Sequence, residues 1–187
     1  MDQKICPVDV IAVYSAGGDI RPLRLRMEDE AHQLMRVDID EIISMNNLAA
    51  AIYMTAQGIP FMQAGEEMLR SKPLGNGTFD HNSYASPDSV NSIKWNDLSK
   101  EIYAKNADYY RGLIAFRKAH PTLRLTTGEA VREQVHPLEG LEPNVVGFPL
   151  RGSVDDPAQA IIVLYNANKT PTTVALPKGV WNVCVTD

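Results

Sequence analysis

The chain has 187 residues and a formal net charge of −5, with 44% apolar and 22% charged residues, a balance typical of one globular domain or two small ones. The acidic balance argues against a non-specific nucleic-acid binder, which needs a basic face. The longest apolar run, 48–54, is too short to cross a bilayer. The first residues are not followed by an apolar segment of the kind that a signal peptide has. We expect neither nucleic acid nor membrane as a partner, and the cellular compartment stays open.

The first third of the chain predicts one strand and one helix. Residues 8–14 (VDVIAVY) suit a short buried strand. Residues 21–36 show no clean period and are interpreted as a loop that could hold a helix. From residue 38, apolar side chains at steps of three and four predict an amphipathic helix that ends near position 56, because Gly58 and Pro60 follow it.

The middle of the chain predicts a strand, a long loop and a second helix. Residues 59–64 (IPFMQA) are short and mostly apolar, which favours a buried parallel strand. Residues 71–92 are rich in Gly, Pro, Asn, Ser and Asp. A loop of this length is either functional or disordered, and the sequence leaves the two open. Residues 108–120 predict a helix that Pro121 ends.

Beyond residue 121 the pattern changes to short β-branched runs separated by turn residues, which favours an antiparallel sheet or sandwich. Strands are expected at 131–135, 145–150, 160–165, 172–176 and 180–185. The chain therefore divides into a helix–strand–helix half and an all-β half. The fold class is α/β plus all-β, with the join between residues 121 and 128.

Glu66 and Glu67 follow the predicted strand at 59–64, at the edge where α/β architectures place their sites. Adjacent side chains on an extended segment point to opposite sides, so the pair does not flank one bond as glycosidase carboxylates do. Packing and hydrogen bonding are therefore favoured over catalysis. The histidines and cysteines show no spacing typical of a metal site or a disulfide framework, and we expect no metal, no cofactor and unpaired thiols at Cys6 and Cys184.

A denser polar cluster lies within the 71–92 loop and just before it. Asn82, Tyr84, Asp88 and Asn91 combine amide, phenol and carboxylate groups, and Arg70 precedes them. Aromatic and charged groups in such a loop favour a binding function. They also suit Asx-type hydrogen bonds within turns, which is the plainer interpretation.

Residues 45–95 resemble type I pullulanases, the debranching branch of the α-amylase family. The pattern Gly-Ile-Pro at 58–60 with Gly-Glu-Glu at 65–67 is similar to the family segment at the eighth barrel strand. The resemblance extends through LRSK at 69–72, NSY at 82–84 and DSVN at 88–91. The runs at 166–168, 176–177 and 179–183 resemble the β-sandwich that follows the barrel. In all, the resemblance covers residues 38–187.

This resemblance implies a fold and its boundaries. Residues 38–121 would form the last strand and helices of a (β/α)8 barrel, and residues 122–187 an antiparallel β-sandwich, both incomplete. Residues 1–37 form an unmatched segment. A complete barrel takes about 200–250 residues, so a chain of 187 residues that also holds a sandwich cannot contain one.

The resemblance also implies a parent enzyme, cytoplasmic or secreted, that cleaves α-1,6-glucosidic branches in pullulan, glycogen or amylopectin. The family's nucleophile and general acid follow barrel strands upstream of this chain. Asp19 is off by one position from the family's third aspartate, so no catalytic residue is assigned and the chain alone is expected to be inactive. The resemblance points to Asn82, Tyr84 and Asp88 as substrate contacts, with Arg70 and Asn91 as positioning residues.

Two other functions remain open at this point. The all-β half could make the chain a non-catalytic α-glucan-binding or docking module. A small enzyme that uses Glu66 or Glu67 is disfavoured, because nothing supplies an opposed carboxylate. A truncated barrel would also leave unpaired strand edges and an uncovered helix face, which predicts self-association.

Overall fold

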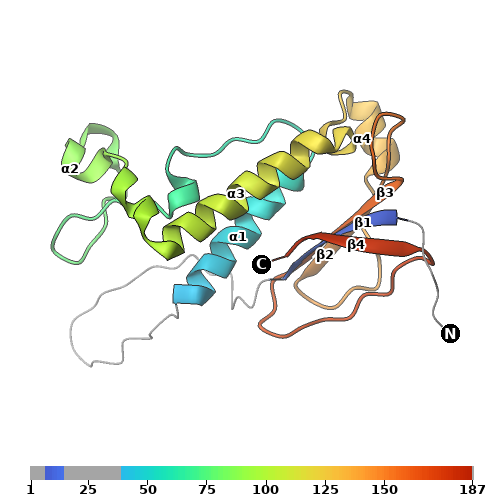
Figure 1. Ribbon diagram of the computed structural model, residues 1–187. Helices are drawn as coiled ribbons and strands as arrows, with labels where there is room; N and C mark the ends of the chain where they lie inside the picture. The colour runs from blue at the N-terminus through green and yellow to red at the C-terminus, as the bar shows by residue number, and fades with distance from the viewer. Residues whose placement is uncertain (1–6, 15–38, 187) are drawn as a thin grey trace.

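The computed structural model describes residues 7–14 and 39–186, and for residues 7–14, 39 and 40 it describes the backbone alone. Two long helices lie at one end of the molecule and a four-stranded sheet lies at the other (Figure 1). We call residues 39–124 the helical half and residues 7–14 with 125–186 the sheet half. The loop and helix considered for 21–36, together with Cys6 and Asp19, fall outside the described residues.

The helical half is built on α1 (Ile39–Thr55) and α3 (Glu101–Ala119). Both predicted helices are confirmed, and α3 begins at residue 101 rather than 108. In the added turns, Glu101 and Lys105 lie on the same face of the helix, because they are four residues apart. They form an ion pair with an N–O distance of 2.5 Å, which stabilises the helix modestly. Leu48 and Met54 of α1 share one apolar core with Leu113 of α3, so the two helices bury their facing stripes against each other.

The sheet half has the strand order β2-β3-β1-β4. The strands are β1 (Pro7–Tyr14), β2 (Val145–Arg151), β3 (Ala160–Asn166) and β4 (Val180–Val185). The strands predicted at 8–14, 145–150, 160–165 and 180–185 are confirmed. β2 and β3 form an antiparallel pair, while β1 runs parallel to both β3 and β4. β3 is buried from Ile161 to Asn166, as expected for a strand that is paired on both sides.

Three predicted strands are wrong. Residues 59–64 have no strand partner and run irregularly above the helices (Figure 1). Residues 131–135 fall largely in helix α4 (Gly128–Gln134), because the Thr127 side chain accepts a hydrogen bond from Ala130 N and starts a helix. Residues 172–176 form no strand. The antiparallel pairing expected beyond residue 121 is confirmed for β2 and β3, whereas β1 enters the sheet in parallel, and the described residues form one sheet rather than the two of a sandwich.

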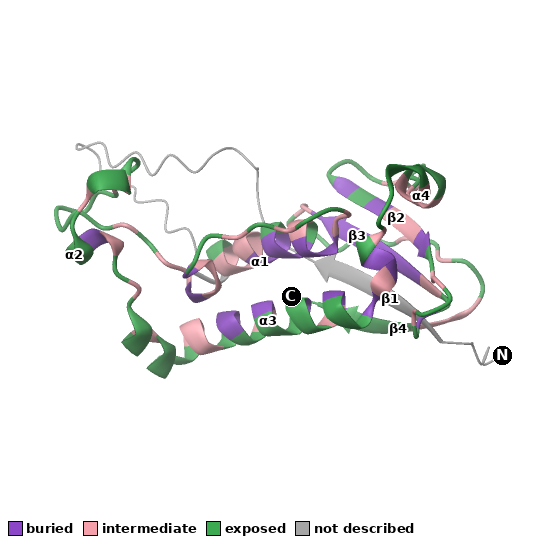
Figure 2. Cartoon of the chain, turned by 90° about the horizontal axis from the view of Figure 1, so that it is seen from above, coloured by how far each residue is buried: buried purple, intermediate pink, exposed green. Residues whose placement is uncertain are grey.

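The two halves share one core. Leu113 and Leu123 from the helical half belong to the same buried cluster as Leu150, Ile161 and Val163 from the sheet. Buried residues gather between the long helices and on β3, whereas the region around α2 is mostly exposed (Figure 2). At the join, Thr55 Oγ1 lies 2.5 Å from the Tyr165 hydroxyl, and burial raises the pKa of Tyr165 to about 12.

Short helical turns fill the connections. They are η1 (Glu66–Met68), η2 (Ser83–Ala85), α2 (Asp88–Asn91), η3 (Trp95–Ser99) and η4 (Pro121–Arg124). The loop predicted over 71–92 therefore contains two helical turns and an antiparallel bridge between Pro73 and Phe79. No helix within the described ranges is long and apolar enough to cross a membrane.

Candidate functional site

Arg70, which directly precedes the 71–92 loop, holds the start of that loop in place. Arg70 Nη1 donates to the Ala64 carbonyl at 2.8 Å, and Nη2 donates to the Asn91 carbonyl. Gly65 adopts a φ of +93°, and a Cβ at this position would lie 2.5 Å from Arg70 Cδ. The glycine therefore supplies both the left-handed turn and the space against which the arginine side chain lies. Arg70 joins the start of the loop to its end.

Asn91 holds the other end of the loop together. Its Nδ2 donates to the carbonyls of Ser83 and Ser86 at 2.7 and 2.8 Å. Its Oδ1 accepts from Lys72 Nζ at 2.6 Å. Both ends of the amide are thus occupied, and the side chain connects α2 with η2 and with the first residues of the loop. Asn91 and Arg70 thus hold the start and the end of the loop together.

Asp80 is an organising residue that the sequence interpretation did not assign. Its Oδ1 accepts from Asn82 N at 2.9 Å, and its Oδ2 accepts from the Ser86 hydroxyl. These two hydrogen bonds hold the pKa of Asp80 below its usual value. The signal was present in the sequence, because an Asp in a turn-rich segment is typical of an Asx turn, in which its side chain bonds the backbone two residues on.

The three side chains expected to contact substrate are presented to solvent. Tyr84 is 97% exposed, and Asn82 and Asp88 are exposed too. Asn82 and Tyr84 lie at η2, and Asp88 is the first residue of α2, so the bonds of Asn91 bring their backbones into one unit. In the part of the chain that the structure describes, these three side chains make no hydrogen bond or ion pair. An amide, an aromatic ring and a carboxylate are therefore available to a ligand from one braced loop.

Glu66 and Glu67 hold the turn that leads into this loop. Glu66 Oε1 accepts from the Tyr53 hydroxyl at 2.9 Å, and Oε2 accepts from Gln63 N at 3.0 Å. Glu67 Oε2 accepts from Gly65 N at 3.0 Å. Burial, then the hydrogen bonds with Tyr110 and Glu66, raises the pKa of Tyr53. These contacts support the structural interpretation of the pair over a catalytic one.

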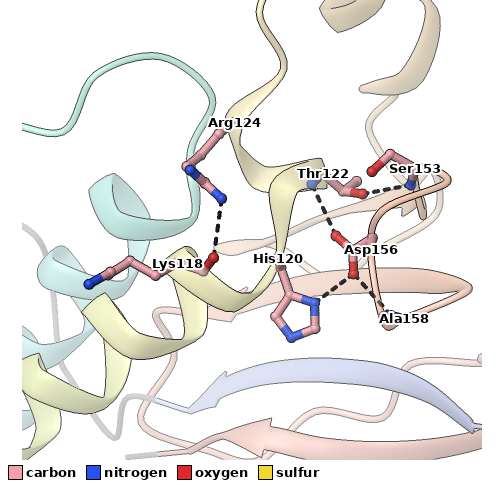
Figure 3. A network of polar contacts seen from close by, with 7 residues as sticks. All are labelled: Lys118, His120, Thr122, Arg124, Ser153, Asp156 and Ala158. Carbon is pink, nitrogen blue, oxygen red and sulfur yellow. Dashed lines mark hydrogen bonds and ion pairs between the residues drawn. The ribbon is translucent and has the colours of Figure 1, made fainter.

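A second polar network joins the two halves and is separate from the loop (Figure 3). His120 Nδ1 lies 2.8 Å from Asp156 Oδ1, and both side chains are buried. Asp156 Oδ2 also accepts from Thr122 N at 3.0 Å, and Thr122 Oγ1 accepts from Ser153 N at 2.9 Å. His120 directly follows α3, so the network fixes the end of the long helix to the β2–β3 connection. Among residues 39–186, no three His, Cys, Asp or Glu side chains gather in a way that could hold a metal ion.

Comparison with known proteins relates this chain to one family. The family model described as "Pullulanase, all-beta domain" matches residues 131–187. The pullulanase of Bacillus subtilis (strain 168) is 33% identical over 138 residues, which cover 73% of this chain and 18% of that protein. The chain is related to the pullulanases. The resemblance seen in the sequence is thereby confirmed, and so is the all-β character of the end of the chain.

Solved pullulanase structures agree with this assignment. The pullulanase from Bacillus acidopullulyticus matches with a TM-score of 0.68 and 38% identity, over 78% of this chain and 17% of that one. A pullulanase variant from Paenibacillus barengoltzii in complex with maltotetraose matches with a TM-score of 0.64 and 38% identity, over 75% of this chain and 20% of that one. The chain therefore spans about a fifth of the length of these pullulanases.

Proposed function

We propose that this chain is the C-terminal part of a pullulanase-type glycoside hydrolase that cleaves α-1,6-glucosidic branches in pullulan, glycogen or amylopectin. Its role in that enzyme is to contact the glucan through the loop of residues 70–91. The observation that carries this proposal is that hydrogen bonds fix the backbone of this loop while three of its polar or aromatic side chains point to solvent. Arg70 and Asn91 fix the backbone, and Tyr84, Asn82 and Asp88 are left free for a ligand. A related pullulanase variant in complex with maltotetraose adds support.

At the level of fold, residues 38–121 would be the end of a (β/α)8 barrel and residues 122–187 an incomplete β-sandwich. Support for the first comes from two packed helices with an apolar segment at 59–64 between them in the chain. Support for the second comes from the all-β family match over 131–187. In the described residues, β1 occupies a central place in a single sheet, so the sandwich would require further strands.

The chain by itself is proposed to be catalytically silent. Retaining glycoside hydrolysis needs two carboxyl groups about 5–5.5 Å apart across the scissile bond. Glu66 and Glu67 are neighbours in the chain, and each accepts a backbone N–H at the same turn. Asp88 is exposed on the loop and would bind rather than react.

The test is electrophoresis of the 187-residue chain through gels that contain amylopectin, together with reducing-sugar release from pullulan. We expect retardation without hydrolysis. Tyr84→Ala and Asp88→Ala should reduce the retardation, because they remove an exposed ring and a free carboxylate. Ser89→Ala is the matched control, since Ser89 is exposed beside Asp88 and no hydrogen bond of its hydroxyl holds the loop. Clear sugar release, or equal retardation of all variants, would contradict the proposal.

A second candidate function is the non-catalytic α-glucan-binding or docking module. It is favoured if retardation is strong and survives loss of Tyr84 and Asp88, because binding would then belong to the sheet half. Self-association through unpaired edges also stays a prediction, and light scattering on the purified chain measures it directly.

A further inference from the structure

The polar loop opens with a short hairpin whose tip is an exposed Asn-Gly pair. Leu74 N donates to the Thr78 carbonyl at 3.0 Å and closes residues 75–77 between them. Asn76 and Gly77 are both exposed at this tip. Gly77 adopts a left-handed φ of +83°, which suits a residue without a Cβ. The side-chain carbonyl of Asn76 is therefore followed directly by a backbone N–H that no side chain shields.

Thr78 polarises the side-chain carbonyl of Asn76. Asn76 Oδ1 accepts one hydrogen bond from Thr78 N at 3.1 Å and a second from Thr78 Oγ1 at 2.5 Å. The bond from Thr78 N closes a ring of atoms that contains both Asn76 Cγ and Gly77 N, so the side chain is folded back over the next peptide unit. Two donors on one carbonyl oxygen stabilise the negative charge that develops there when a nucleophile adds to the carbon.

The nucleophile and the leaving group of such an addition are both free. Within the described residues, neither Gly77 N nor Asn76 Nδ2 takes part in a hydrogen bond. Because the attacking nitrogen and the carbon it attacks belong to neighbouring residues, the reaction is intramolecular and has a high effective concentration of nucleophile. The tip thus combines a polarised carbonyl, an unbonded attacking N–H and an unbonded amine that can leave.

Asn91 shows that this combination is not common to every asparagine of the loop. It is also followed by a small residue, Ser92. There, however, Ser92 N donates to the Asp88 carbonyl at 2.8 Å. Asn91 Nδ2 donates to two backbone carbonyls at 2.7 and 2.8 Å. The nucleophile and the leaving group are therefore both occupied at Asn91 and both available at Asn76.

We propose that Asn76 is a site of spontaneous deamidation in the folded chain, with water as the only co-reactant. Gly77 N bonds to Asn76 Cγ, the Cγ–Nδ2 bond breaks, and the amide proton of Gly77 leaves with the Nδ2 group as ammonia. The product is a five-membered succinimide. Water then adds to one of its two carbonyl carbons. Opening at Cγ gives aspartate, and opening at the backbone carbon gives isoaspartate, with no oxidation or reduction in either case.

The products alter the hairpin in two ways. Both place a carboxylate at position 76, and the isoaspartyl form also adds one carbon to the backbone. The longer backbone no longer fits the turn that Leu74 N and the Thr78 carbonyl close, so the Leu74 amide should exchange its hydrogen faster in this form. The inference depends on the geometry of the tip and does not rest on the proposed glucan contacts.

The experiment incubates the full 187-residue chain in buffers of neutral to mildly alkaline pH and follows its peptides by mass spectrometry after proteolysis. An isoaspartyl methyltransferase labels the isoaspartyl product. We expect conversion at Asn76 to be at least about tenfold faster than at Asn91, since two hydrogen bonds must open there first. Both products should appear, and the rate should rise with pH because hydroxide removes the Gly77 amide proton. The same chain unfolded in urea should react no faster at Asn76 than the folded chain.

Two variants test the role of the neighbouring residues. Thr78→Val keeps the backbone N–H but removes the hydroxyl donor, and should slow conversion about two- to tenfold, the kinetic equivalent of one hydrogen bond. Thr173→Val is the matched control, because Thr173 is an exposed threonine of the sheet half, and it should react as the unmodified chain does. Asn76→Gln should release no ammonia at the tip, because its side chain would have to close a larger ring.

Three results would overturn the proposal. The first is conversion at Asn91 while Asn76 stays intact. The second is faster conversion of Asn76 in urea than in the folded chain, which would show that the Thr78 hydrogen bonds hold the side chain away from Gly77 N. The third is a Thr78→Val chain that reacts as fast as the Thr173→Val control while both keep the circular dichroism of the unmodified chain.

Discussion

The helical half and the sheet half differ in how completely they cover their own apolar groups. Of thirteen large exposed hydrophobic side chains among residues 41–186, ten belong to the helical half and three, Val146, Val154 and Val183, to the sheet half. The strand β3 is buried along almost its whole length by its two neighbours. The helical half buries one stripe of each long helix and leaves much of the remainder in solvent (Figure 2). The helical half therefore leaves more large apolar side chains in solvent than the sheet half does, although the two halves share one core.

The largest expected effect comes from the same substitution made once in each half. Ile161→Ala removes a fully buried side chain of β3 and should lower the free energy of unfolding by about 2–5 kcal/mol. Ile59→Ala removes an exposed side chain and should change it by less than about 0.5 kcal/mol. Urea denaturation followed by circular dichroism measures both. A large decrease in the free energy of unfolding for Ile59→Ala would contradict this difference between the halves, because the Ile59 side chain would then be covered in the isolated chain.

Arg117 tests how a buried charge holds the end of α1 in the helical half. This buried guanidinium donates to the carbonyls of Met54, Ala56 and Gly58 at the end of α1. Burial lowers its pKa, and the charge of Arg124 adds to that effect. Arg117→Met should cost about 1–3 kcal/mol in urea denaturation, since three carbonyls lose their donor. Lys118→Met, at an exposed neighbouring position, is the control and should be close to neutral.

The Asp156 network tests the connection between the halves. Burial by itself raises the pKa of Asp156, but hydrogen bonds from His120, Ala158 and Thr122 outweigh it and leave the pKa below its usual value. The stabilisation is therefore complete above the unfolded pKa of about 3.9 and is lost as the pH falls through the lower folded pKa. Asp156→Asn should cost about 1–2 kcal/mol at pH 7.

Thermal unfolding between pH 2.5 and 7 checks the sign of this effect. The difference in stability between the unmodified chain and Asp156→Asn should shrink toward the acid end. A difference that stays constant with pH would show that the carboxylate charge of Asp156 contributes nothing to the join.

The smallest expected effect is at the cap of α4. Thr127 accepts a hydrogen bond from Ala130 N at 3.1 Å, and Thr127→Ala should cost about 1 kcal/mol. The neighbouring Thr126→Ala is the control, because Thr126 is exposed and does not cap the helix. If Thr127→Ala converts 131–135 to strand by circular dichroism, the cap alone decided between helix and strand there.

The sequence predicted best where local pattern and tertiary packing agree. The helix α1 and the part of α3 from residue 108 follow from apolar residues at helical spacing, and the strands β2 and β3 follow from β-branched runs. The loop residues were also locatable, because Arg70, Asn82, Tyr84, Asp88 and Asn91 stand in a recognisable order. The hydrogen bonds that hold these residues in place, above all those of Asp80 and Asn91, could not be predicted from the sequence. A turn signal does not say which carbonyl an amide will reach.

The sequence by itself determined the family, the two long helices and the composition of the polar loop. Tertiary structure decided which apolar runs become strands, because a strand exists only where a neighbour pairs its backbone. Residues 160–166 have β1 and β2 beside them and are buried. Ile59 and Phe61 belong to an equally apolar run that has no strand neighbour in the described chain, so their side chains stay exposed. The sequence determines whether a segment is apolar, whereas the tertiary structure determines which neighbour buries it.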